Sequence, residues 1–182
     1  MLGLVFTEFV ELVEEKFSPE IADAVLTDAA SPHGGAYTAV GYYPHEELVA
    51  MVGALAQRTG VPAPDLVKGF GGHLLQRFEQ AHARMFDRHD NFFDFVASIH
   101  DQIHVEVRKL YDNVALPSFT VLSREGWVMR LLYQSPRAME QLAQGLLEGA
   151  AAHYQEACRI SQSPYDGPEG QGVLFTLEKS AP

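Results

Sequence analysis

IHVEVRKLYDNVALPSF, from Ile103 to Phe119, is the stretch around which the rest of the chain is organised. From Phe92 into this stretch, apolar residues recur at steps of three and four, which stacks side chains along one face of a helix. They are Phe92, Val96, Ile99, Ile103, Val107 and Leu110. His104 lies beside this stripe. We therefore expect a helix that begins at Phe92, ends before Pro117 and turns His104 toward the edge of an apolar interior.

A buried imidazole needs a partner for each of its ring nitrogens. The partner is a backbone carbonyl, a carboxylate, a water molecule or a metal ion. A lone histidine on an apolar flank is more often a hydrogen-bonded core residue than a metal ligand. The surroundings of His104 in the sequence leave both interpretations open.

A second stretch, Leu131–Met139, reads LLYQSPRAM. The alternation before Tyr133 predicts a strand, and Ser135 followed by Pro136 is typical of a helix N-terminus. We expect a phenol, a hydroxyl and the Arg137 guanidinium to meet beside that N-terminus, where they would suit carboxylates. The alternative is an ordinary helix cap with a surface arginine.

Together, the two stretches resemble the heme nitric oxide/oxygen-binding (H-NOX) family. The match rests on Tyr133-x-Ser135-x-Arg137, a histidine thirteen residues before Pro117, the start Met1-Leu2-Gly3-Leu4-Val5 and the pair Phe70-Gly71. The resemblance implies a heme b group with His104 as its iron ligand. It also implies that Tyr133, Ser135 and Arg137 hold the heme propionates. Pro117 corresponds to the proline that presses on the porphyrin and distorts it.

The choice of gas depends on the face of the heme opposite the histidine. In oxygen-binding members of this family a tyrosine stands five residues after the arginine, and here that position is Leu142. With Val5, Leu74 and Phe78, Leu142 predicts an apolar distal wall. We therefore expect nitric oxide sensing, carbon monoxide binding with less consequence, and no stable dioxygen complex. By resemblance, nitric oxide would weaken or break the iron bond of His104 and shift its helix.

Composition limits the other functions. The chain has 182 residues, of which 47% are hydrophobic, and we expect one domain, 1–182. A net charge of −11 with 13 scattered Lys and Arg residues argues against nucleic-acid and anionic-membrane partners. Glutamates from Glu8 onward interrupt the apolar start, so we expect neither a signal peptide nor a membrane span. The lone Cys158 fits a cytoplasmic protein.

The resemblance implies a sensor rather than an enzyme, and we expect it to signal to a separate protein. Bacterial members suggest a histidine kinase or a cyclic-di-GMP enzyme as that partner. We expect the acidic surface of the chain to carry the contact.

The expected fold is α+β: a mostly helical N-terminal part, then a small antiparallel sheet with an inserted helix, and the heme between the two parts. The expected helices are 3–17, 18–30, 45–58 with Gly60 as its stop, one from Pro64, and 136–154. The expected strands are 118–122, 126–133 and 173–177, with a hairpin turn at 123–125 and a loop at 161–172. Cys158 is expected in a helix.

Two other functions remain open on the residues alone. The first is a non-heme metal enzyme that uses His100 and His104 with a carboxylate such as Glu106. The second is an interaction domain without a cofactor, in which His104 and Arg137 are structural.

Overall fold

The computed structural model describes residues 1–110 and 115–180 of the chain. Its elements are α1 (Gly3–Lys16), α2 (Pro19–Asp28), α3 (His45–Thr59), α4 (Ala63–Phe86), α5 (Phe92–Ser98), the π-helix η1 (Ile99–Ile103), α6 (His104–Leu110), β1 (Ser118–Glu125), β2 (Val128–Gln134), α7 (Glu140–His153), β3 (Cys158–Gly167) and β4 (Gly170–Lys179). The strands form one antiparallel sheet in the order β1-β2-β4-β3. This confirms the expected α+β class, with α7 inserted between β2 and β3.

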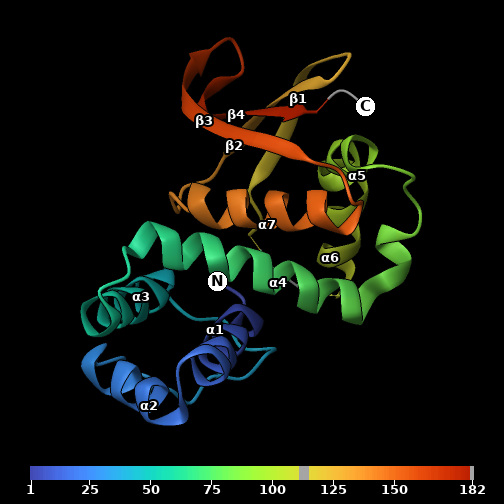
Figure 1. Ribbon diagram of the computed structural model, residues 1–182. Helices are drawn as coiled ribbons and strands as arrows, with labels where there is room; N and C mark the ends of the chain where they lie inside the picture. The colour runs from blue at the N-terminus through green and yellow to red at the C-terminus, as the bar shows by residue number, and fades with distance from the viewer. Residues whose placement is uncertain (111–114, 181–182) are drawn as a thin grey trace.

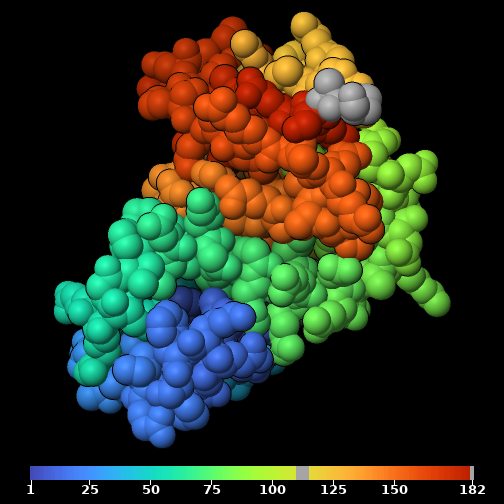
Figure 2. Space-filling model, in the orientation of Figure 1, coloured from blue at the N-terminus to red at the C-terminus, as the bar shows by residue number. Residues whose placement is uncertain are grey.

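The elements are stacked in layers (Figure 1). The sheet lies at one end, α7 runs beneath it, α4 crosses the middle and α1, α2 and α3 form the other end. The same order is visible on the surface, where α7 forms a band between the strands and α4 (Figure 2). Helix α4 thus connects the helical end of the molecule with the part that carries the sheet.

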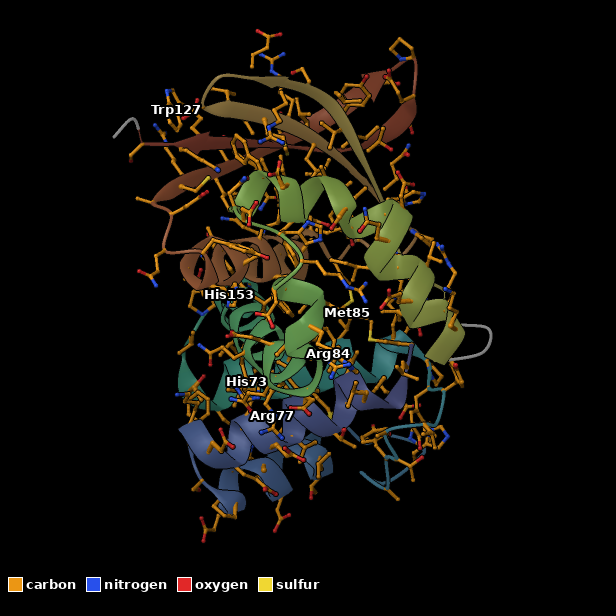
Figure 3. All side chains as sticks on the ribbon, turned by 90° about the vertical axis from the view of Figure 1, so that its right-hand side faces the viewer. His73, Arg77, Arg84, Met85, Trp127 and His153 are labelled. Carbon is orange, nitrogen blue, oxygen red and sulfur yellow. The ribbon has the colours of Figure 1, made fainter. Side chains whose placement is uncertain are left out.

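The N-terminal helices start and end where their local sequence predicts. Ser18 caps α2, and its hydroxyl accepts a hydrogen bond from the Ile21 amide at 3.3 Å. Gly60 ends α3 in the left-handed conformation, with φ of 73°. Helix α1 is joined to α4 by Arg77, which donates to Glu8 at 2.8 Å and to Glu11 at 2.9 Å (Figure 3).

Glycines allow α4 and α7 to pack backbone against backbone. A methyl group at Gly145 would collide with the Lys68 carbonyl oxygen, and one at Gly71 would collide with the Leu142 carbonyl oxygen. Two apolar clusters meet at these helices, one beneath the sheet and one among the N-terminal helices. The close packing of α4 against α7 therefore brings the two apolar clusters next to each other.

The sheet is larger than the sequence predicts, and three expectations about it were wrong. The expected loop 161–172 belongs to the hairpin of β3 and β4, whose register is unbroken from Cys158 opposite Lys179 to Gly167 opposite Gly170. Cys158 therefore begins a strand rather than lying in a helix. The hairpin after β1 turns at 126–127, later than expected, because β1 continues to Glu125.

Helix α7 begins at Glu140, so the expectation of a start at Ser135-Pro136 was wrong. The Ser135 hydroxyl accepts the Arg137 amide at 3.2 Å, which closes a turn rather than capping a helix. Ala138 then has a positive φ of 47°, which interrupts helical geometry. None of the helices within 1–110 and 115–180 combines the length and hydropathy that a membrane span requires.

Candidate functional site

A cavity of about 380 Å³ opens between α1, α4, α7, η1, α6 and the strands β1 and β2, and its walls are mostly apolar. Its volume falls within the range of small-molecule and cofactor sites. All nine residues that the sequence singled out line this one cavity. They are Val5, Leu74, Phe78, His104, Pro117, Tyr133, Ser135, Arg137 and Leu142.

His104 is the first residue of α6 and is buried, with 9% of its surface exposed. Its Nδ1 atom is buried and has no hydrogen-bond partner among the described residues. Burial lowers the pKa of His104 to about 4; Arg108 and His100 act in the same direction, and the Pro117 carbonyl opposes them. The imidazole is therefore neutral at pH 7, which is the protonation state that metal ligation requires.

The backbone before His104 differs from the expected uninterrupted helix. Asn91 starts α5 by accepting the Asp94 amide at 3.0 Å, and the helix then widens into η1 at Ile99. The amide of His104 donates to the Ile99 carbonyl, five residues earlier, which is the π-helical pattern. The spacing of apolar residues gave no sign of this extra residue in the turn.

Tyr133, Ser135 and Arg137 lie at the end of β2 and in the turn that follows it. Tyr133 is buried opposite Phe119, with 5.3 Å between the ring centroids, and burial raises the pKa of its phenol. Arg137 donates to the Ala115 carbonyl at 2.7 Å. In 1–110 and 115–180, no ion pair joins Arg137 to a carboxylate. This turn therefore presents a cation to the cavity.

Several lining residues were missed by the sequence reasoning. Phe119 contacts the His104 ring, with 5.8 Å between the ring centroids. The two residues are fifteen positions apart in the sequence, and only the fold brings them together. His82 lies at a kink in α4, where its φ of −137° and ψ of 41° depart from helical values. Leu146 and Ala150 line the cavity from α7 and follow Leu142 at four-residue steps, a signal that the sequence did contain.

The alternative non-heme metal cluster is not formed among the described residues. In the part of the chain that the structure describes, no group of three His, Cys, Asp or Glu side chains could hold a metal ion. Glu106 instead pairs with Arg88 at 2.7 Å, and the rings of His100 and His104 are 6.5 Å apart. The cavity therefore offers the neutral imidazole of His104, apolar walls and a cation, which together suit a flat apolar ligand that carries a metal ion and carboxylates.

The chain is similar to known proteins in sequence and in fold. A family model described as haem-NO-binding matches residues 2–162. The unliganded Fe(II) H-NOX protein from K. algicida is 30% identical, with a TM-score of 0.92, and the match covers 100% of this chain and 98% of that chain.

Two further structures have a bound ligand named with them. An H-NOX protein from S. oneidensis in the Fe(II)NO state is 30% identical, with a TM-score of 0.89 and 100% coverage of both chains. The IWP-051-bound H-NOX from Shewanella woodyi in the Fe(II)CO state is 36% identical, with a TM-score of 0.83, and the match covers 99% of this chain and 95% of that chain. No curated protein sequence matches the chain.

Proposed function

The chain belongs to the haem-NO-binding (H-NOX) family of heme-based gas sensors, and we propose that it senses nitric oxide through a heme held by His104. The observation that carries this proposal is the buried, neutral imidazole whose Nδ1 has no partner among the described residues. A core histidine kept for stability would be expected to satisfy both ring nitrogens.

The residues of the cavity fit heme b. The apolar walls suit the macrocycle, and Arg137 together with the Tyr133 and Ser135 hydroxyls suits its propionates. Pro117 lines the cavity beside His104 and would press on the plane of the ring. When bound, heme supplies an iron with one position open to a diatomic gas.

The choice of gas rests on the lining residues that we propose as the distal wall. Val5, Leu74 and Phe78, with Leu142, provide no hydrogen-bond donor from their side chains, and a donor there would favour dioxygen. We therefore propose nitric oxide as the signal and carbon monoxide as a further ligand, without a stable dioxygen complex. The histidine and tyrosine that also line the cavity, His82 and Tyr42, are outside the wall that the sequence predicts.

His104 also explains how binding could become a signal. It begins α6, so a change in its bond to iron would act directly on that helix. We propose that 1–182 is one sensor domain without enzymatic activity. We propose that the domain is cytoplasmic and that its partner is a histidine kinase or a cyclic-di-GMP enzyme that contacts its acidic surface, given the net charge of −11.

An anaerobic absorption spectrum of the reduced protein, before and after nitric oxide and after separate exposure to air, tests the proposal. We expect a Soret band that shifts with nitric oxide and no stable oxygenated spectrum. His104→Ala should lose heme and regain it with added imidazole. His100→Ala is the matched control, because His100 does not line the cavity, and it should keep heme. Heme retention by His104→Ala without imidazole would contradict the axial role.

A further inference from the structure

The helix that carries His104 changes its hydrogen-bond pattern immediately before that residue. Segment η1 spans Ile99–Ile103, and the His104 amide closes it by donating to the Ile99 carbonyl. A π-turn contains one residue more than an α-turn, and such turns are frequent at functional sites. The chain therefore holds one spare residue between α5 and the residue proposed to ligate iron.

Helix α5, upstream of the spare residue, is held in place. Five of its seven residues are buried. Asp94 pairs with Arg124 of β1 at 2.5 Å, and the Lys179 ammonium of β4 lies 4.1 Å from the centre of the Phe93 ring. These contacts tie α5 to both β1 and β4, so α5 cannot turn about its axis without breaking them.

Segment η1 is held much less firmly. None of its residues is fully buried: Ile99 and Ile103 pack partly against the core beneath the sheet, and Asp101 and Gln102 are exposed. Few buried contacts are typical of segments that rearrange locally. Beyond η1, His104 is the buried residue of α6 among those whose side chains are described. The rotation of α6 relative to α5 is therefore restrained chiefly by the His104 ring in the cavity, together with Val107, which also lines the cavity, and the ion pair between Glu106 and Arg88.

We propose that η1 is a register switch: it stays π-helical while His104 is held, and it becomes α-helical when His104 is released. The His104 amide would then move from the Ile99 carbonyl to the His100 carbonyl. Because α5 is fixed, α6 would turn by about 100° and advance by about 1.5 Å, the values for one residue of an α-helix. This inference rests on the proposed function, since it requires His104 to be held by iron and released by nitric oxide.

Deletion of Gln102 tests the switch in the full chain. It places His104 four residues after Ile99, so the same amide and carbonyl can form an α-helical bond with no spare residue. Gln102→Ala is the matched control, because it removes the same exposed side chain and keeps the register. Hydrogen–deuterium exchange of residues 104–110 is measured in the heme-loaded proteins with and without nitric oxide.

We expect nitric oxide to increase exchange of these residues in the unaltered protein and in Gln102→Ala, and this increase to be lost in the deletion variant. An equal increase in all three proteins would overturn the switch. Absorption spectra recorded on the same samples separate the two proposals. If the unaltered protein takes up no heme, or if its spectrum does not change with nitric oxide, the proposed function is wrong and the switch is wrong with it.

A distance measurement decides the question even if the deletion variant does not fold. Spin labels are attached at Ala97→Cys on α5 and Lys109→Cys on α6, both exposed positions, in a Cys158→Ser background. A turn of 100° at a side-chain radius of 5 to 6 Å displaces the second label by about 8 Å. A change in the label-to-label distance on adding nitric oxide supports the switch, and an unchanged distance overturns it.

Discussion

Replacing Gly145 by alanine should destabilise the protein through the contact between α4 and α7. The added methyl group would collide with the Lys68 carbonyl oxygen and lie 3.0 Å from the Gly71 Cα atom. These are backbone atoms of α4, so the two helices must move apart. Overpacking of this kind costs about 1–3 kcal/mol. We expect a cost at the upper end of this range, because the colliding atoms belong to the backbone and cannot rotate away. Alanine returns about 1 kcal/mol through its helix propensity.

The net expectation for Gly145→Ala is a loss of roughly 2 kcal/mol in the free energy of unfolding, or about 4–8 °C in Tm. Urea denaturation followed by circular dichroism, at equal heme loading, measures it. Gly69→Ala is the matched control on α4, because a methyl group there meets no atom within 4 Å. That variant should be more stable by about 1 kcal/mol. A Gly145→Ala protein as stable as the original would refute the close-packing argument.

Two further predictions concern the cavity. His104 is neutral in the folded apoprotein because its pKa is lowered to about 4 from 6.5, so between these values the unfolded chain binds more protons. The free energy of unfolding of the apoprotein should therefore rise by up to about 3 kcal/mol from pH 4 to pH 6.5 and level off above. His104→Leu should lose that slope in urea titrations, and a slope that persists would assign it to other groups. Leu142→Tyr should add a hydrogen-bond donor to the cavity and introduce dioxygen affinity, which is measured as an oxygenated spectrum in air. Leu142→Phe is the control of similar size. An unchanged spectrum of Leu142→Tyr would show that Leu142 does not face the bound gas.

Short sequence patterns correctly predicted much of the N-terminal helical part. The hydroxyl of Ser18 and the left-handed Gly60 act on neighbouring amides, so their effect is visible in a short piece of sequence. The strand before Tyr133 was likewise predicted from its alternation, and the structure places it at Val128–Gln134. The residues proposed to hold heme were found because short motifs mark them, although their roles stay a prediction.

Other features depended on partners distant in the sequence. Residues 161–172 are rich in glycine and proline and predict a loop, yet β3 pairs with β4 along its whole length and Pro164 lies on an edge strand, where a missing amide is tolerated. The turn before α7 is set by the Ser135 hydroxyl and by Ala138, which compete with the helix start that Ser-Pro predicts.

The sequence alone determined the N-terminal helices, the alternation of the strand before Tyr133 and the residues that carry unusual chemistry, because these properties depend on side chains a few positions apart. The tertiary structure decided that nine separated residues line one cavity, since that requires α4 and α7 to meet at Gly71 and Gly145. It also decided the π-turn before His104. The π-turn lies between α5, which the sheet holds, and the buried His104, and these two positions are set by contacts distant in the sequence.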